Sequence, residues 1–180
     1  MPTIVTHAAV PLCLGLGLGS RIIPPRLLLV GVAIAMLPDA DVLAFKLGVA
    51  YGHVFGHRGF THSLLFAFAL PTLPTLAMLG HRQFRASAAT VWAFLLVSLL
   101  SHSLLDSLTT GGKGVGWFWP WRDERFFAPW QMIRVAPFKL EAYLTVRGEA
   151  VILSELYWVW LPGVALMLVL MGCIYSPGRG

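Results

Sequence analysis

Long apolar stretches, separated by short polar or proline-containing segments, make up most of the sequence. A helix needs about 20 mostly apolar residues to cross the hydrocarbon core of a bilayer, so the pattern predicts about five spans. We expect these spans at residues 3–19, 27–49, 60–79, 86–105 and 153–175. Prolines predict a kink in the third span and a bend at Pro162-Gly163 in the fifth.

The composition supports a membrane protein. Of the 180 residues, 57% are hydrophobic and 12% are charged, with a mean hydropathy of +0.75, whereas about a quarter of the residues of soluble domains are charged. These values exclude a disordered chain, a nucleic-acid-binding domain and an ordinary cytosolic enzyme. The net charge of +5 comes without a basic run, which is typical of cations at the ends of spans. We therefore expect an all-α, polytopic membrane helix bundle, one domain over residues 1–180, with membrane lipids and no nucleic acid as partners.

Residues 107–150, between the fourth and fifth spans, have a different composition. The segment opens with a glycine-rich turn and holds four of the seven tryptophans, mixed with charged residues. Tryptophans beside charges are typical of the boundary between membrane and water. The sequence therefore predicts an aromatic-rich interfacial segment between the last two spans.

Histidines and aspartates gather on one side of the predicted membrane. Alternation of the spans places all the carboxylates of the first 122 residues on the side where the N-terminus lies, together with most of the histidines. The residues concerned are His7, Asp39, Asp41, His53, His57, His62, His102 and Asp106. Ionisable side chains inside spans cost a few kcal/mol each on insertion, so they are kept for partners or for function.

The spacing of these residues is typical of metal ligands. His102 and Asp106 are four residues apart, so on a helix both side chains lie on one face, about one turn apart. Asp39 and Asp41 follow Pro38, and an extended backbone there would let them bind the same ion or two adjacent ions. Each pair alone is a weak signal, but together they predict one centre.

A pair of histidines completes the pattern. His57 and His62 lie around a glycine at a loop-to-helix junction, where a turn can direct both imidazoles to one centre. Imidazoles and carboxylates without a thiolate suit zinc, with manganese or iron as alternatives, in a site of one to three ions. Such ions make hydroxide from water near neutral pH and polarise phosphoryl oxygens.

Several cations are candidates for binding a substrate phosphate. Arg58 lies between the two histidines, and its forked donors suit a phosphate group. Lys113, Arg122 and Arg125 are alternatives from the interfacial segment, or they contact lipid headgroups.

Four ordered blocks resemble the predicted membrane-bound, metal-dependent hydrolases of the YdjM-like family, often called LexA-regulated. The blocks are Thr6-His7 and residues 37–41, 57–63 and 101–112, and the similarity runs from about residue 3 to about residue 130. This family is thought to be distantly similar to the zinc-dependent phospholipase C and single-strand nuclease superfamily, whose helical enzymes use clustered His and Asp ligands. The resemblance implies metal ligands at His7, Asp39, Asp41, His57, His62, His102 and Asp106. His53 has no counterpart, and only one HxxxD pair is present.

These observations favour a membrane-embedded, metal-dependent hydrolase that cleaves a phosphoester of a lipid entering laterally. In this interpretation Asp39 or Asp41 bridges metals or orients the water, Arg58 holds the phosphate, and residues 117–130 line the entrance. One alternative is a metal or proton transporter that uses the same cluster, and another is a structural membrane subunit in which the cluster joins helices.

The expected location is the bacterial inner membrane. Arginines are dense in the short loops 20–26 and 81–85 and in the C-terminal tail, on the side opposite the cluster. Because positive charge in short loops marks the cytoplasmic side, we expect the cluster to face the extracytoplasmic side.

Overall fold

The secondary structure is helical in a computed structural model that describes residues 1–79, 86–137 and 139–175. The segments are η1 (Thr6–Ala8), α1 (Ala9–Leu18), α2 (Pro25–Met36), η2 (Leu37–Leu47), η3 (Phe60–His62), α3 (Leu64–Leu79), α4 (Ala88–Ser107), η4 (Leu140–Leu144), α5 (Val146–Glu155), η5 (Leu156–Trp160) and α6 (Leu161–Tyr175). Two isolated β-bridges, and no strands, occur in these ranges. The expected all-α class is confirmed.

Three helical stretches are long and apolar enough to cross a membrane. They are Pro25–Leu47, Ala88–Ser107 and Val146–Ile174. The expected first and third spans form apolar helices of only 10–17 residues, Thr6–Leu18 and Leu64–Ala77, within the part of the chain that the structure describes. The helical membrane bundle is thus confirmed, whereas the number of spans that cross the bilayer stays a prediction.

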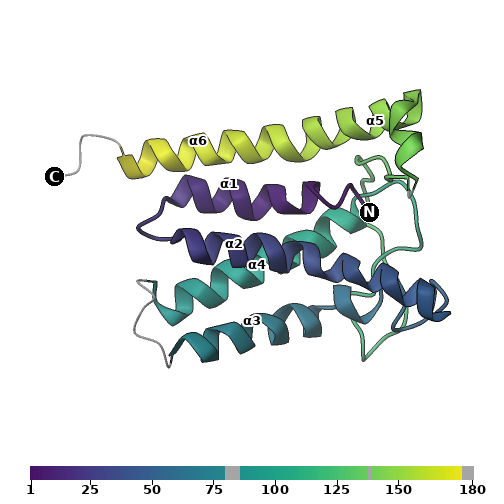
Figure 1. The fold of residues 1–180 in the computed structure, drawn as a ribbon, viewed down its shortest axis with the longest axis horizontal. Helices are drawn as coiled ribbons and strands as arrows, with labels where there is room; N and C mark the ends of the chain where they lie inside the picture. The colour runs from purple at the N-terminus through teal and green to yellow at the C-terminus, as the bar shows by residue number, and fades with distance from the viewer. Residues whose placement is uncertain (80–85, 138, 176–180) are drawn as a thin grey trace.

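The helices lie side by side along one common direction. In Figure 1, α3, α4, α2, α1 and the continuous α5–η5–α6 rod follow one another across the bundle, and α1 contacts α6 while α2 and α3 both contact α4. The N-terminus and the long loops occupy one end, and α6 ends at Tyr175 toward the other. Residues 81–85 and the tail beyond 175, which entered the orientation argument, lie outside the described residues.

An apolar core joins α2 to α4 at the end away from the loops. Leu27 of α2 and Val91, Phe94 and Leu95 of α4 are buried together, and the Phe94 ring packs against Gly31. This packing sets α2 and α4 in register, so the residues at their other ends come to the same level.

Two prolines lie where the helices change type. Pro38 has no N–H to continue α-helical bonding, and the chain passes from α2 into the 3-10 helix η2 at Leu37. Pro162 follows the π-helical segment η5, so the helix changes type just before the expected bend at Pro162-Gly163, and the bend itself stays a prediction. The last helix also begins at Val146, seven residues before the predicted position 153, which shortens the interfacial segment.

Serines mark two helix starts. The Ser87 side chain accepts a hydrogen bond from the Thr90 amide at 3.1 Å, and the Ser63 hydroxyl accepts one from the Phe66 amide at 3.1 Å. Such caps satisfy amides that have no partner inside the helix. The third predicted span therefore divides into the short turn η3 and the helix α3.

Candidate metal centre

The predicted ligands meet at the end of the bundle that carries the N-terminus and the long loops (Figure 1). They come from four places in the chain: His7 from η1, Asp39 and Asp41 from η2, His57 and His62 from the 48–63 loop and η3, and His102 and Asp106 from the last turns of α4. His53, which has no counterpart in the resembled family, lies outside the cluster, and its ring nitrogen accepts a hydrogen bond from the Phe55 amide.

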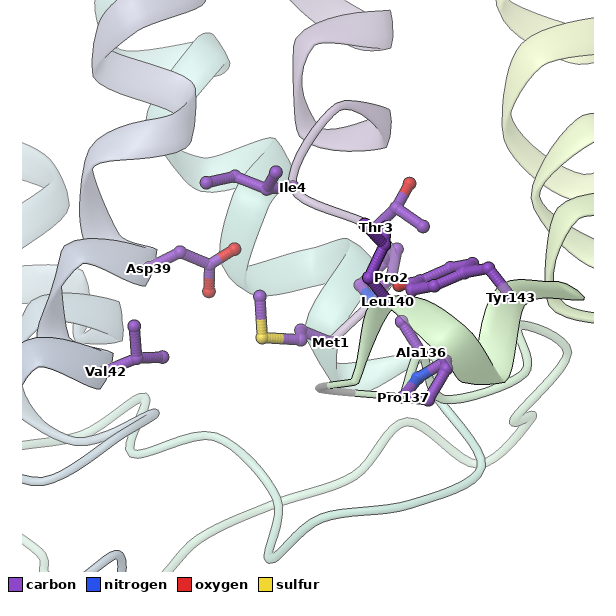
Figure 2. Close-up of a pocket in the computed structure, with 10 residues that line it drawn as sticks. All are labelled: Met1, Pro2, Thr3, Ile4, Asp39, Val42, Ala136, Pro137, Leu140 and Tyr143. Carbon is purple, nitrogen blue, oxygen red and sulfur yellow. The ribbon is translucent and has the colours of Figure 1, made fainter. Parts of the chain in front are cut away.

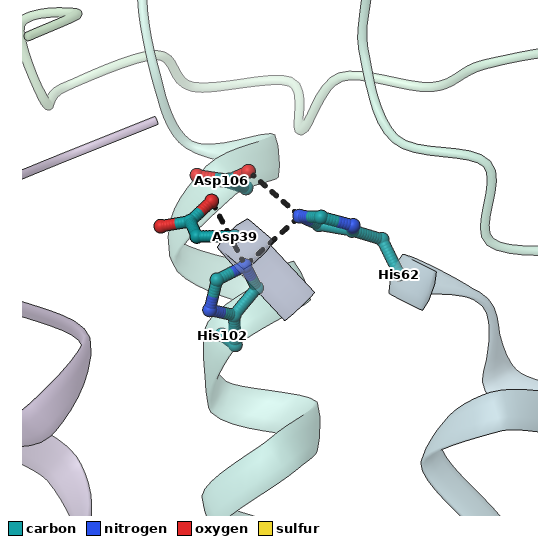
Figure 3. A group of neighbouring side chains, drawn as sticks. All are labelled: Asp39, His62, His102 and Asp106. Atoms are coloured by element: carbon teal, nitrogen blue, oxygen red, sulfur yellow. Dashed lines mark hydrogen bonds and ion pairs between the residues drawn. The ribbon is translucent and has the colours of Figure 1, made fainter. Parts of the chain in front are cut away.

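Four of these side chains form an inner group whose ligand atoms all lie within 4.8 Å of one another. They are Asp39, His62, His102 and Asp106, and Figure 3 shows them directed toward one point from η2, η3 and α4. Nε2 of His102 lies 2.9 Å from Nε2 of His62 and 3.6 Å from Oδ1 of Asp39. All four residues are buried. Because α4 supplies His102 and Asp106 four residues apart, the predicted one-face pair is confirmed as a geometric arrangement.

The hydrogen bond at Nδ1 of His102 determines which ring nitrogen carries the proton. Nδ1 lies 2.7 Å from the carbonyl oxygen of Ala35, which can only accept a hydrogen bond. Nδ1 of the neutral ring therefore carries the proton, and Nε2 presents a lone pair to the inner group. This arrangement, in which one nitrogen is held by a carbonyl and the other is free to ligate, is typical of metal-binding histidines.

Asp41, His57 and His62 form an outer group next to the first one. Oδ1 of Asp41 lies 2.6 Å from Nδ1 of His57, and Oδ2 accepts from the Thr61 hydroxyl at 2.8 Å. His62 belongs to both groups, because Nδ1 lies 3.4 Å from Asp41 Oδ2 while Nε2 faces the inner group. The outer group can hold a second ion, or Asp41 can orient the two imidazoles from behind.

The two aspartates after Pro38 belong to different groups, because the backbone there is not extended. They lie in the 3-10 helix η2, which has about three residues per turn and turns side chains two positions apart by about 120°. Asp39 therefore enters the inner group and Asp41 the outer group. The sequence identified both residues but not their separation.

His7 lies against the inner group rather than inside it. Its ring stacks on that of His102 with centroids 3.8 Å apart, and Nε2 lies 3.5 Å from Oδ2 of Asp39 and 3.6 Å from Oδ1 of Asp106. The side chain is fully buried. Its position makes His7 available as a further ligand of an ion held by the inner group.

Several buried atoms at this centre have no hydrogen-bond partner among the described residues. They include both ring nitrogens of His7, both carboxylate oxygens of Asp39 and Oδ1 of Asp106. Buried polar atoms are almost always satisfied in folded proteins, because desolvation without a partner is costly. A divalent cation could bind Nε2 of His7 together with carboxylate oxygens of Asp39 and Asp106, and imidazole and carboxylate donors suit such an ion. The donor set therefore fits a metal ion.

Arg58 is buried among protein acceptors, whereas binding a substrate phosphate would require free guanidinium donors. The side chain is fully buried, with Nε 2.9 Å from Oδ2 of Asp106, Nη1 donating to the Gly111 carbonyl and Nη2 donating to the Thr109 hydroxyl, both at 3.0 Å. Burial lowers the pKa of Arg58, and the charge of Asp106 opposes that shift. The structure thus assigns Arg58 to holding Asp106 and the 109–112 turn, in place of the phosphate contact expected from the sequence.

The glycine-rich turn after α4 is shaped by this guanidinium. Gly112 has φ of +97°, and a Cβ atom there would lie 2.8 Å from Nη1 of Arg58. Both the left-handed backbone and the close approach require glycine. The glycine-rich turn noted in the sequence therefore closes over the buried Arg58 side chain.

Arg125 also has structural partners. Its Nη1 donates to the His57 carbonyl at 2.6 Å, and Nη2 donates to the carbonyls of Tyr51 and His53 at 3.1 and 3.0 Å. Burial lowers the pKa of Arg125, and burial also raises the pKa of Tyr51. Arg125 thus ties the interfacial segment to the loop that carries His57, while Lys113 and Arg122 are exposed.

Glu155 is a residue that sequence reasoning missed. It lies in α5 with 4% exposure and accepts hydrogen bonds from the Thr3 amide at 2.5 Å and from the Thr3 and Thr6 hydroxyls at 2.6 Å. The Trp160 indole donates to the same Thr6 hydroxyl at 3.1 Å. These bonds fix the segment just before His7. The available signal was an acid inside an apolar stretch, which is retained only for a partner or a function.

Replacing Glu155 with glutamine is expected to weaken Zn²⁺ binding by about tenfold, the lower end of the range for residues that orient ligands. Glutamine replaces one accepting carboxylate oxygen with a donating N–H₂ group, which then faces the donors of Thr3 or Thr6. We expect the segment that holds His7 to shift as a result. Competition with a chromophoric chelator measures the affinity. Glu149→Gln, an exposed acid of the same helix, is the matched control, and equal affinities in the two variants would contradict this role.

A cavity of about 280 Å³ reaches Asp39 from the side of the N-terminal segment (Figure 2). Its walls are mainly apolar: Met1, Pro2, Thr3, Ile4, Val42, Ala136, Pro137, Leu140 and Tyr143 surround the Asp39 carboxylate. Leu140, from η4, is 83% exposed at the rim. None of the aromatic residues 117–130 lines this cavity, so the entrance to Asp39 differs from the one expected from the sequence.

The fold and the site together define a class of protein. This is an integral membrane protein, built from apolar helices, with a buried His/Asp cluster at one end that could hold a metal ion.

Comparison with known proteins identifies the family. The chain matches the family described as YdjM inner membrane protein over residues 1–180, and it therefore belongs to the YdjM family. Inner membrane protein YbcI of Escherichia coli (strain K12) is 71% identical over 167 residues, which cover 93% of this chain and 95% of that protein. Inner membrane protein YdjM of the same strain is 37% identical over 94 residues, 48% of this chain and 46% of its own. No solved structure matches the chain. The membrane location expected from the sequence is confirmed.

Proposed function

We propose that this protein is a membrane-embedded, metal-dependent hydrolase that cleaves a phosphoester of a lipid with water. The observation that carries the proposal is the set of buried imidazole and carboxylate atoms that have no hydrogen-bond partner among the described residues, with the Asp39 carboxylate bordering an apolar cavity. A structural role alone would bring these atoms within hydrogen-bonding distance of one another or of backbone groups, whereas Nε2 of His7 lies 3.5 Å from Oδ2 of Asp39.

The residues divide into ligands and residues that position them. Asp39, His62, His102 and Asp106 would hold a divalent ion, with His7 beside them and the outer group ready for a second ion. When bound, such an ion lowers the pKa of water and stabilises negative charge on phosphoryl oxygens. Zinc is the ion that these donors favour, with manganese or iron as alternatives.

Asp39 is the residue best placed to act on a substrate. Its carboxylate belongs to the inner group and also borders the apolar cavity, as Figure 2 shows. It can therefore orient a water molecule between the cluster and a group that enters the cavity. Arg58 would position Asp106, and Asp41 would position His57 and His62.

A lipid is the substrate class that the cavity favours. Apolar side chains line the path to Asp39, and η4 exposes Leu140 and Leu144 beside it, at 83% and 92%. An acyl or polyprenyl chain could occupy this path while its phosphoester reaches the cluster.

Transport of a metal or proton is less well supported. A transport pathway has to continue to the opposite end of the bundle, where Leu27, Val91 and Phe94 form an apolar core. Charged and polar groups are costly in such surroundings. Protein reconstituted in vesicles that carried Zn²⁺ or protons across the bilayer would favour the transporter.

Phosphate release from lipids tests the proposed activity. Metal-loaded protein in detergent is expected to release phosphate from phosphatidic acid or a polyprenyl phosphate, to lose activity with a chelator, and to regain it when the ion is restored. Asp39→Asn should reduce the rate by more than about 100-fold, consistent with the loss of a group at the reacting centre. His53→Ala is the matched control. A metal-loaded protein that hydrolyses none of these lipids would contradict the proposal.

The proposal retains the extracytoplasmic orientation of the cluster. A cysteine placed at the exposed Lys113 should react with an impermeant reagent from outside the inner membrane. Reaction from the cytoplasmic side alone would reverse the orientation.

A further inference from the structure

A second cavity, of about 510 Å³, lies where α5 begins, away from the metal centre. Its lining combines two arginines and a threonine with small apolar side chains. The lining residues are Thr110, Arg134, Val135, Val146, Arg147, Ala150 and Val151.

The backbone that carries Arg134 is held on both sides. The Arg134 amide donates to the Ser154 hydroxyl of α5 at 2.9 Å, and the Val135 amide donates to the Thr110 hydroxyl at 3.3 Å. The Thr110 amide in turn donates to the Ile133 carbonyl at 2.9 Å. Arg134 is therefore presented from a fixed segment that lies along the face of α5.

The two guanidinium groups at this cavity have no partner in the part of the chain that the structure describes. Neither Arg134 nor Arg147 forms an ion pair or a side-chain hydrogen bond with any described residue, whereas Arg58 and Arg125 each bind several acceptors. Arg147 is also the second residue of α5, whose first turn has no side-chain cap. The first turn also carries the exposed Glu149. Two cations without a partner among the described residues outnumber its single negative charge and, with the amides of the uncapped turn, create a local preference for an anion.

The apolar wall of the cavity continues into the membrane. Val146 begins the stretch Val146–Ile174, which is apolar and long enough to cross a bilayer. The cations therefore lie at the boundary where lipid headgroups are found, and Val135, Ala150 and Val151 provide a surface for the first carbons of an acyl chain.

We propose that this cavity binds the phosphate group of an anionic phospholipid, with Arg134 and Arg147 contacting the phosphate. A phosphate could also come from solution, and the chemistry of recognition is the same for both sources. The apolar wall and the position at the start of a span assign the site to the lipid. None of the proposed metal ligands lines this cavity, so the lipid-binding proposal does not rest on the proposed hydrolase activity.

Lipid retention in native mass spectrometry tests the site. Protein in detergent is mixed with phosphatidylglycerol or with phosphatidylcholine, and the bound fraction is measured for the parent and for the double variant Arg134→Gln/Arg147→Gln. The parent should retain phosphatidylglycerol over phosphatidylcholine, and the double variant should bind phosphatidylglycerol roughly tenfold more weakly, because it loses two charge-assisted contacts.

The matched control is Arg21→Gln/Arg26→Gln, which removes the same charge from the opposite end of the bundle. Arg26 is likewise the second residue of a helix that begins a candidate span, and it lines none of the cavities described. Equal loss of phosphatidylglycerol in both double variants would overturn the site, because general attraction between cations and anionic lipid would then explain retention.

Three further measurements test the lipid assignment and separate this site from the metal centre. Arg134→Lys/Arg147→Lys preserves charge, and its intermediate retention supports contacts by both guanidinium groups. Displacement of phosphatidylglycerol by millimolar inorganic phosphate would overturn the assignment to a lipid. The metal content of the glutamine double variant should equal that of the parent, which separates this site from the metal centre.

Discussion

Replacing His102 with alanine is expected to lower the affinity for Zn²⁺ by more than about 100-fold, since even residues behind the ligands cost 10–100-fold when they are lost. The substitution removes the nitrogen that faces both His62 and Asp39, and it leaves the Ala35 carbonyl without its donor. Competition with a chelator of known affinity measures the loss.

His53→Ala is the matched control for this prediction. His53 lies in the same loop region as two cluster histidines, but its ring nitrogen contacts only the Phe55 amide among the described residues. We expect its metal affinity to match that of the parent. Equal effects of the two alanine substitutions would show that the cluster is not where the metal binds.

Replacing Arg58 with glutamine is expected to reduce the free energy of unfolding by about 3–5 kcal/mol, the usual cost of removing one partner of a buried ion pair. The change leaves the Asp106 carboxylate buried without its cation and deprives the Gly111 carbonyl and the Thr109 hydroxyl of a donor. Unfolding in detergent, followed by circular dichroism, measures the effect.

Two variants define the alternatives for Arg58. Arg122→Gln removes an exposed arginine and should change stability by less than about 0.5 kcal/mol. Arg58→Lys keeps the charge but cannot reach three acceptors with a planar fork, so it should fall between the parent and the glutamine variant. A stable Arg58→Gln protein that loses only lipid hydrolysis would instead favour the phosphate contact.

The sequence predicted which histidines and aspartates gather in one cluster because chemistry and spacing are local properties. His102 and Asp106 are four residues apart on one helix, so a regular helix is enough to bring them together. Apolar stretches around rare acids also indicated which residues share a membrane side. The structure adds to this by placing the same residues within a few ångströms of each other, from four separate segments.

The positions of Asp39 and Asp41 could not be read in the same way. Pro38 restricts the local backbone, but the sequence does not show whether the residues after it are extended or 3-10 helical. That difference decides whether the two carboxylates face one ion or separate groups.

The contacts of Arg58 could not be predicted from the sequence, because its partner Asp106 is distant in the chain. It is the described non-glycine residue with positive φ, at 63°, and this backbone directs its side chain to Asp106, 48 positions away in the chain. Neither the left-handed conformation nor the partner follows from local sequence. An arginine between two histidines therefore looked like a ligand for phosphate, whereas tertiary packing made it a partner of Asp106.

The most direct test of this account is the metal content of the parent protein, purified in detergent from cells grown with adequate trace metals. Elemental analysis is expected to find at least about one divalent ion per chain, consistent with a donor set that fits a metal ion. A folded, monodisperse protein that contains no stoichiometric metal, and takes up none on addition of Zn²⁺, Mn²⁺ or Fe²⁺, would contradict the central claim.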